Sequence, residues 1–214
     1  MKKLLCALLA LVMCLVLSAC REEIDLYEGV PLPVATITME NGKVMRAELY
    51  VGEAPNTVGN FIELAKSGFY DGMEFYRVVA GCLIQTGDPV GDGTGGPGYT
   101  IDGEFPDNGV ENGVKHTRGT LSMARLEDDK NSAGSQFFIL QSGFSEYDGK
   151  YAAFGRLTDD ASLSVLDGIA ASAADGNYHP LVAQKIKTIR VETQGYVFPV
   201  VKQFPEEEGE GKDE

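Results

Sequence analysis

The sequence FYRVVAGCLIQTGD, residues 75–88, predicts two short strands that turn back on each other. β-Branched and aromatic residues fill the first strand, Ala80-Gly81 interrupts it, and Gly87-Asp88 ends the second. Because side chains alternate along a strand, Arg77 shares a face with apolar neighbours in the first strand, and Gln85 does so in the second. On this stretch alone, two ordinary amphipathic strands with solvated polar residues remain the alternative. The rest of the chain is needed to decide whether Arg77 and Gln85 belong to a functional site or to a solvated surface.

Strand patterns and two helical patterns surround this hairpin. Alternating or apolar runs predict further strands at residues 34–39, 44–50, 119–124, 135–140, 151–155 and 185–191. Helical spacing of apolar residues predicts one helix that is capped by Asn56 and stopped by Gly68, and a second that is capped by Asp159 or Asp160. Two helices among about eight strands predict a mainly β fold, a closed eight-stranded antiparallel barrel whose ends the helices cover.

Residues 1–19 have the pattern of a bacterial lipoprotein signal peptide. Lys2-Lys3 is a basic start, Leu4 to Leu17 is an apolar stretch too short to span a membrane, and small residues precede the cleavage point. Leu17 to Cys20 resembles a lipobox, which predicts that Cys20 is lipidated and anchors the protein on the extracytoplasmic side of the cell membrane. Residues 20–32 would then be a tether. Ordinary secretory cleavage, with Cys20 incidental, is the alternative.

Cysteine content and charge narrow the class of partner. If Cys6 and Cys14 leave with the signal peptide and Cys20 carries lipid, Cys82 alone remains and no intramolecular disulfide can form. The formal charge of −14 becomes −16 once Lys2-Lys3 is removed, which argues against nucleic acid as a partner. The membrane would be contacted through the lipid only. Residues 195–214 are predicted to be a C-terminal extension that ends in a disordered acidic tail.

Three patterns resemble cofactor or metal sites but lack what such sites need. Residues 91–96 fit G-x-G-x-x-G, yet Pro97 follows where a phosphate-binding helix would have to begin. The acidic run at residues 127–129 lacks the ligand spacing of a calcium loop. His116 has no carboxylate or nucleophile pattern beside it, and we interpret it as structural. No cofactor and no metal are therefore expected.

Five motifs along the chain together resemble the cyclophilins, the barrel-fold peptidyl-prolyl cis-trans isomerases. In order they are FYRVVAGCLIQTGD, GTGG, LSMAR, SAGSQFFI and DGKYAAFG, and the resemblance covers about residues 33–194. It implies an isomerase of X-Pro bonds whose catalytic residues are Arg77 and Gln85. Leu83 and Phe138 match the residues of the family's proline pocket. The residues that match the neighbouring peptide groove are Gly93, Ala124, Arg125 and Gln136.

The departures from the family pattern lie inside the site. Tyr76, Cys82, Tyr147 and Tyr151 stand where the family has a histidine, a phenylalanine, a leucine and a second histidine, and Glu146 replaces a tryptophan. Loss of the ring at Cys82 removes apolar surface worth roughly 1–2 kcal/mol at ~25 cal/mol per Å², and Tyr147 is expected to restore part of it. The altered pocket implies reduced affinity for cyclosporin-like ligands. The protein is expected to be a monomer.

Three functions fit these observations. The first is an active peptidyl-prolyl isomerase that assists the folding of exported proteins, which the retention of Arg77, Gln85 and Phe138 favours. The second is a catalytically weak proline-peptide binding module or holdase chaperone, which the loss of the ring at Cys82 favours. The third is a structural lipoprotein without peptide affinity. In the first two, the partners are proline-containing polypeptides.

Overall fold

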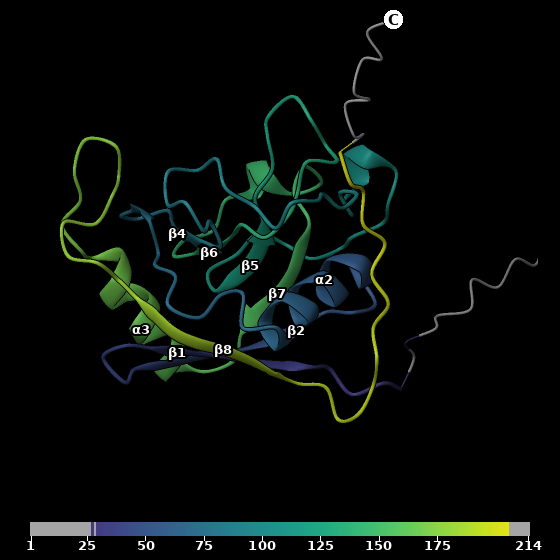
Figure 1. Ribbon diagram of the computed structural model, residues 1–214, viewed down its shortest axis with the longest axis horizontal. Helices are drawn as coiled ribbons and strands as arrows, with labels where there is room; N and C mark the ends of the chain where they lie inside the picture. Colours follow the sequence, from purple (N-terminus) through teal and green to yellow (C-terminus); the bar gives the residue numbers. More distant parts are fainter. Residues whose placement is uncertain (1–26, 28, 206–214) are drawn as a thin grey trace, which may run out of the picture.

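Eight antiparallel strands form the frame of the computed structural model, which describes residue 27 and residues 29–205 (Figure 1). The strands in this part of the chain are β1 (Val34–Met39), β2 (Val44–Leu49), β3 (Arg77–Val79), β4 (Leu83–Thr86), β5 (Thr120–Met123), β6 (Phe137–Leu140), β7 (Ala153–Leu157) and β8 (Ile186–Glu192). The helices are α2 (Pro55–Lys66), α3 (Asp160–Ala170) and the short 3-10 helices η1 (Pro106–Asn108) and η2 (Ser145–Tyr147). The predicted signal peptide, Cys20 and the acidic tail lie outside the described residues.

The sheet is an open half-barrel, so the prediction of a closed barrel is wrong. Its strand order is β3-β4-β6-β5-β7-β2-β1-β8, which leaves β3 and β8 each with only one neighbouring strand. The chain just before these two strands meets in an isolated bridge between Glu74 and Lys185. Beyond it, the backbone N–H of Val78 in β3 donates to the carbonyl of Tyr178 at 2.8 Å. The loop at residues 171–185 therefore occupies the edge where a closing strand would pair. The mainly β class and the two helices are confirmed.

α2 packs against the sheet and contributes several buried residues to the core. Its Phe61 is fully buried and packs against three rings, with centroid distances of 5.4 Å to Tyr70 and 5.3 Å to both Phe137 and Phe154. Burial of such a side chain stabilises the fold by roughly 1.5–3 kcal/mol. Since Phe137 belongs to β6, this cluster also fixes the strand that carries Phe138 and follows directly on Gln136.

A carboxylate from a distant loop caps α2. The backbone N–H groups of Asn56 and Thr57 and the Thr57 hydroxyl all donate to the buried carboxylate of Glu104, at 3.0, 2.7 and 2.6 Å. The prediction that Asn56 caps this helix is wrong, because the helix already begins at Pro55. The other two predicted signals are confirmed: Gly68, with φ of 77°, follows α2, and the Asp159 side chain accepts from the first turn of α3.

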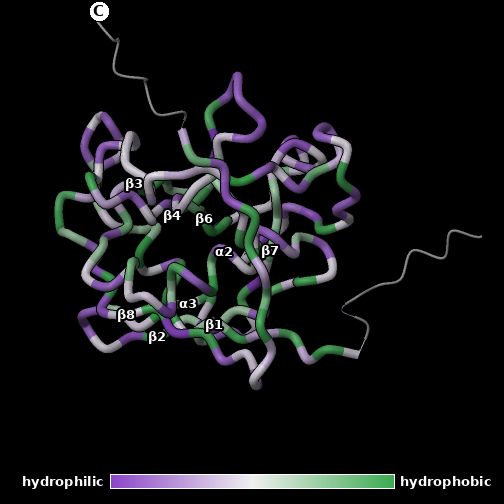
Figure 2. Tube along the Cα trace, turned by 45° about the vertical axis from the view of Figure 1, so that its right-hand side comes forward, coloured by the Kyte–Doolittle hydropathy of each residue, from purple (hydrophilic) through white to green (hydrophobic). Residues whose placement is uncertain are grey.

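Residues 196–205, which we call the C-terminal segment, pack along α2 (Figures 1 and 2). Phe198 in this segment is buried, and its ring centroid lies 6.1 Å from that of Tyr27. The helix admits the segment at Gly59, where an added Cβ would lie only 2.9 Å from the carbonyl oxygen of Pro199. α2 is therefore covered on both its sheet side and its outer side. No helix in the described part of the chain has the length and hydropathy needed to cross a membrane.

Candidate active site

The hairpin of β3 and β4 places Arg77 directly opposite Gln85. These two residues are partners in the antiparallel register, and Nη1 of Arg77 donates to Oε1 of Gln85 at 3.1 Å. Gly81, with φ of 78°, makes the turn between the strands. Among the described residues no carboxylate lies within ion-pair distance of the half-buried Arg77 guanidinium. Arg77 therefore keeps hydrogen-bond donors free for a ligand.

A chain of side-chain hydrogen bonds continues from Gln85 across the site. Nε2 of Gln85 donates to the Tyr76 hydroxyl at 2.6 Å and to Oε1 of Gln136 at 3.0 Å. The Tyr76 hydroxyl in turn donates to the same Gln136 oxygen at 2.6 Å. Nε2 of Gln136 is held by the carbonyls of Gly93 and Gly95, at 3.0 and 2.9 Å. The network thus fixes the orientation of both amide side chains relative to Arg77.

Tyr76 is the residue through which this network is joined. Its side chain is buried, and burial, with the nearby negative charge of Asp88 as the second cause, raises the pKa of Tyr76 to about 12. The hydroxyl therefore stays protonated at neutral pH and can donate to Gln136 while it accepts from Gln85. A tyrosine at the family's histidine position supplies a bridge here, rather than a titrating group.

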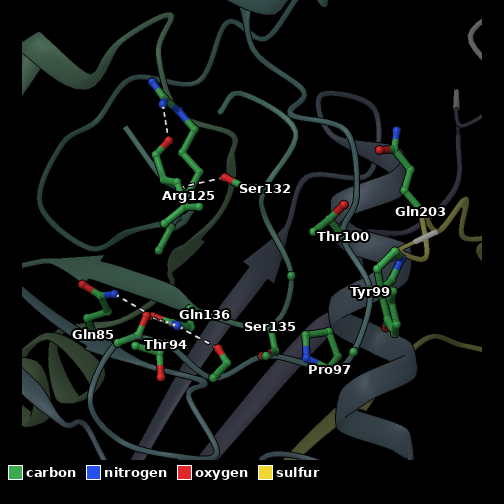
Figure 3. A pocket seen from close by; sticks show the side chains of 18 of the residues that line it. Gln85, Thr94, Pro97, Tyr99, Thr100, Arg125, Ser132, Ser135, Gln136 and Gln203 are labelled. Carbon is green, nitrogen blue, oxygen red and sulfur yellow. Dashed lines mark hydrogen bonds between the residues drawn. The ribbon is translucent and has the colours of Figure 1, made fainter. Parts of the chain in front are cut away.

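A cavity of about 900 Å³ opens beside the network (Figure 3). Arg77, Gln85 and the glycine-rich loop at residues 93–100 line it. The residues predicted to form a peptide groove, Gly93, Ala124, Arg125 and Gln136, all line this cavity. Gln203, Phe204 and Pro205 of the C-terminal segment also line it, and Gln203 lies across the cavity from Gln85 (Figure 3). These three residues were not among the predicted site residues.

The predicted proline-pocket residues form a separate apolar cluster beside the hairpin. Leu83 and Phe138 are buried in it, with exposed fractions of 3% and 4%, and Cys82, Tyr147 and Tyr151 pack against them. The Phe138 ring lies 5.8 Å from each of the two tyrosine rings, which are 5.0 Å from each other. The tyrosines thus pack edge-on against Phe138. Because Phe138 is only 4% exposed, a proline ring can contact it only after neighbouring side chains move.

Tyr147 fills space next to Cys82. Burial raises the pKa of the Cys82 thiol, against opposing effects of the Arg77 charge and of a hydrogen bond with Tyr147. Cys82 is the free cysteine of the described residues. The expectation that Tyr147 replaces part of the apolar surface missing at Cys82 is therefore consistent with their positions.

Arg125 holds a loop as well as lining the cavity. Its Nε donates to the carbonyl of Lys150 at 3.0 Å, and Nη1 donates to the carbonyls of Leu126 and Glu127 at 2.8 and 2.7 Å. The guanidinium also lies 4.8 Å from the ring centroid of Tyr151. Arg125 consequently links the cavity wall to the apolar cluster.

Sequence reasoning missed Tyr178, which lies against Arg77. The Arg77 guanidinium is 5.7 Å from the centroid of its ring, and its φ of 66° is unusual for a residue other than glycine. Asp175 stabilises this turn, because its carboxylate accepts from the backbone N–H groups of Asn177 and His179 at 2.8 and 3.0 Å. The Gly176-Asn177 pair signals a turn in the sequence, but no pattern there shows which strand the turn faces.

His116 lies directly behind the apolar cluster and has a carboxylate beside it that the sequence pattern did not show. It is 2% exposed, with Nδ1 3.1 Å from Oδ1 of Asp148 and Nε2 3.0 Å from the hydroxyl of Ser122. Its ring centroid is 6.4 Å from that of Phe138 and 5.9 Å from that of Tyr147. His116 therefore packs against Phe138 and Tyr147 on the side of the apolar cluster that faces the core. In the described part of the chain no cluster of histidine, cysteine or acidic residues could hold a metal ion.

The comparisons with known proteins show the class to which this half-barrel belongs. Residues 34–191 match the family described as "Cyclophilin type peptidyl-prolyl cis-trans isomerase/CLD". The protein therefore belongs to the cyclophilin-type peptidyl-prolyl cis-trans isomerase family.

Relatives with this activity in their names are similar over most of their length. A peptidyl-prolyl cis-trans isomerase of Synechococcus elongatus is 45% identical over 62% of this chain and 85% of its own. One of Helicobacter pylori is 44% identical over 63% of this chain and 78% of its own. A crystal structure of a Cryptosporidium parvum cyclophilin-type isomerase superposes with a TM-score of 0.67 at 31% identity, covering 76% of this chain and 98% of that one. The same protein crystallised in the presence of the dipeptide Ala-Pro gives a TM-score of 0.64 at 32% identity, covering 74% of this chain and 98% of that one.

Proposed function

We propose that this peptidyl-prolyl isomerase acts on exported polypeptides at the membrane surface, with Arg77 as its catalytic residue. The observation that carries the assignment of Arg77 is its guanidinium, which lines an open cavity, has no carboxylate partner among the described residues and is held by Gln85. An arginine that served only the stability of the sheet would be expected to have an ion-pair partner when half-buried.

The reaction needs no nucleophile. The barrier to rotation of an X-Pro bond, near ~18–20 kcal/mol, arises from amide resonance, and uncatalysed exchange takes tens of seconds or longer. When the bond twists, the prolyl nitrogen gains a lone pair that neither planar ground state has. A hydrogen bond from Arg77 to that lone pair stabilises the twisted state selectively, which lowers the barrier.

Gln85 would bind the carbonyl of the residue before proline. Both N–H groups of its amide are already used, by Tyr76 and by Gln136. A substrate carbonyl can take one of these bonds without leaving a polar group unpaired, because the Tyr76 hydroxyl still donates to Gln136. Tyr76 and Gln136 are thus positioning residues for Gln85. Leu83 and Phe138 would then bury the proline ring once Tyr147 or Tyr151 has moved.

A proline-peptide binding module with weak catalysis is the second candidate, and the burial of Phe138 favours it. Isomerisation of an Ala-Pro peptide by the full chain in detergent separates the two. Acceleration of exchange supports the isomerase. Measurable peptide affinity without acceleration would support the binding module.

For either function we propose that the protein is a monomer. We also propose that its affinity for cyclosporin-like ligands is reduced, because Cys82 and Tyr147 alter the pocket.

The lipid anchor is tested separately. The signal-peptide pattern and the lipobox-like sequence at residues 17–20 support lipidation of Cys20 and a site of action outside the cytoplasm. We predict that Cys20→Ser moves the protein from the membrane fraction to the soluble fraction. A substituted protein that still sediments with membranes would rule out Cys20 as the anchor.

A further inference from the structure

Contacts with α2 fix the path of the C-terminal segment. The side-chain amide of Asn56 donates to the carbonyl of Val201 at 3.0 Å and accepts from its N–H at 2.6 Å. Lys202 forms an ion pair with Glu63, and its Nζ lies 4.6 Å from the ring centroid of Tyr99. The ion pair is exposed and contributes little, so the two-way amide contact is the stronger anchor.

Beyond this anchor the segment pairs with the glycine-rich loop. Gln203 and Thr100 exchange both backbone hydrogen bonds, each of 2.8 Å, as an isolated antiparallel bridge. The Gln203 side chain also donates to the carboxylate of Asp102 at 2.6 Å. The ring of Phe204 follows, with its centroid 5.7 Å from that of Tyr99. The backbone directly before Phe204 is therefore held by the glycine-rich loop.

Large apolar side chains are left exposed where this segment meets the cavity. Phe204 and Leu126 are 69% and 66% exposed, and both line the cavity that also contains Arg77 and Gln85. Figure 3 shows Gln203, Thr100 and Tyr99 across the cavity from Gln85 and Gln136. Exposed apolar groups gathered on one cavity indicate a binding surface rather than scattered surface residues.

We propose that the C-terminal segment is part of the substrate site. Gln203, Phe204 and Pro205 form its far wall and select polypeptides that carry an apolar side chain near the proline. These residues lie beyond the part of the chain that matches the family, residues 34–191. The proposal rests on the proposed function, because it takes the Arg77 end of the cavity as the position of the X-Pro bond.

Because Arg77 and Phe204 line the same cavity, the group that contacts Phe204 can be inferred. A polypeptide with its X-Pro bond at Arg77 extends along the same cavity that Phe204 lines, so a flanking side chain of that polypeptide is the group that meets Phe204. The competing occupant is this chain itself, since residues 206–214 follow directly on Pro205. Peptides with different flanks, together with a variant of the tail, distinguish the two occupants.

The test compares two peptides that share an Ala-Pro centre and differ only in flanks of equal length, serine in one and leucine in the other. The measured quantity is the ratio of kcat/KM for the leucine peptide to that for the serine peptide, with the full chain in detergent. Phe204→Ala should lower this ratio about threefold to tenfold, because the leucine side chain no longer packs against a ring. Asn56→Ala, which releases the segment at Val201, should lower it in the same direction. Val197→Ala is the matched control, since Val197 is 85% exposed in the same segment and does not line the cavity.

An unchanged ratio in Phe204→Ala, in a protein with the melting temperature of the wild type, would overturn the proposal. Replacing residues 206–214 by a glycine-serine sequence of equal length tests the other occupant. If that replacement raises affinity for both peptides equally and Phe204→Ala leaves the ratio unchanged, the tail occupies the wall and the proposal fails. If the wild type turns over neither peptide, the proposed function fails, and the ratio of dissociation constants for the same peptides and variants then decides the proposal.

Discussion

Cys82 stands where the family has a phenylalanine, and this difference alters the predicted proline pocket more than the other departures do. A phenylalanine at this position would enlarge the apolar surface, but the space beside Cys82 is shared with Tyr147. Adding a ring to an already packed cluster costs typically 1–3 kcal/mol, because side chains must leave their preferred rotamers. The two positions are therefore coupled and have to be changed together.

We predict that Cys82→Phe alone lowers the melting temperature and does not raise kcat/KM for an Ala-Pro peptide. Cys82→Phe combined with Tyr147→Leu should recover the stability and raise kcat/KM above that of the wild type, because the tyrosine no longer covers Phe138. Tyr147→Leu alone is the control. The coupling is read from the double-mutant cycle. Additive effects of the two substitutions would show that the two side chains do not share the pocket.

Several candidate site residues could be named from the sequence. Alternation gives the faces of Arg77 and Gln85, which lie on strands, but the resemblance to the cyclophilins is what assigned them and Gln136 to a site. Tyr178 could not be predicted, because it lies in a loop whose direction depends on tertiary contacts. The burial of Phe138 also escaped prediction, since it depends on how Tyr147 and Tyr151 pack from another part of the chain.

At the scale of elements, α2 depends on a cap that comes from outside the helix. Glu104 lies 48 residues after Asn56 in the sequence, and its buried carboxylate accepts a hydrogen bond from the backbone N–H of Asn56. The carboxylate satisfies donors that a helix start leaves unpaired, and its charge is favourable beside the positive end of the helix dipole. Local sequence rules search the residues next to the helix, so they selected Asn56, whose side chain instead binds Val201.

We predict that Glu104→Ala lowers the free energy of unfolding by about 1–3 kcal/mol, because buried N–H donors lose their acceptor. Glu104→Gln should cost less, since its amide oxygen can still accept. Chemical denaturation of the full chain in detergent measures both changes. Glu111→Ala, an exposed acidic residue of the same stretch of chain, is the matched control. Equal stability of Glu104→Ala and Glu111→Ala would contradict the capping role.

For the whole molecule, the closure of the sheet was the feature of the fold that sequence patterns could not predict. Strand patterns predict pairing partners poorly when the decisive contact is made by a loop, as it is where Val78 bonds to Tyr178. The outcome is a sheet edge next to Arg77 that bonds to a loop instead of a strand. The same molecule buries His116 between the sheet and the apolar cluster, and this burial makes its stability depend on pH.

Burial lowers the pKa of His116 below its ordinary value of 6.5, against the opposing effect of Asp148. As the pH falls through about 6.5, His116 becomes protonated in the unfolded chain before it does so in the folded protein. The free energy of unfolding should therefore fall as the pH falls below about 6.5. The lowered pKa of Asp148 acts in a separate window, below its ordinary 3.8. We predict that His116→Gln flattens the dependence below about pH 6.5. His179→Gln is the control, and a slope that disappears with His179 but not with His116 would contradict the assignment.

Arg77 is proposed to stabilise the twisted X-Pro bond, and a comparison of rate with affinity separates this role from ground-state binding of the substrate. A charged hydrogen bond in a partly desolvated site is worth roughly 1.5–3 kcal/mol, or about 10 to 150-fold in rate. For the full chain in detergent, Arg77→Ala should lower kcat/KM for an Ala-Pro peptide at least about tenfold while peptide affinity changes much less. Arg77→Lys should restore little of the rate, since an ammonium lacks the planar set of donors. An Arg77→Ala protein that keeps the rate of an active wild type would contradict the mechanism.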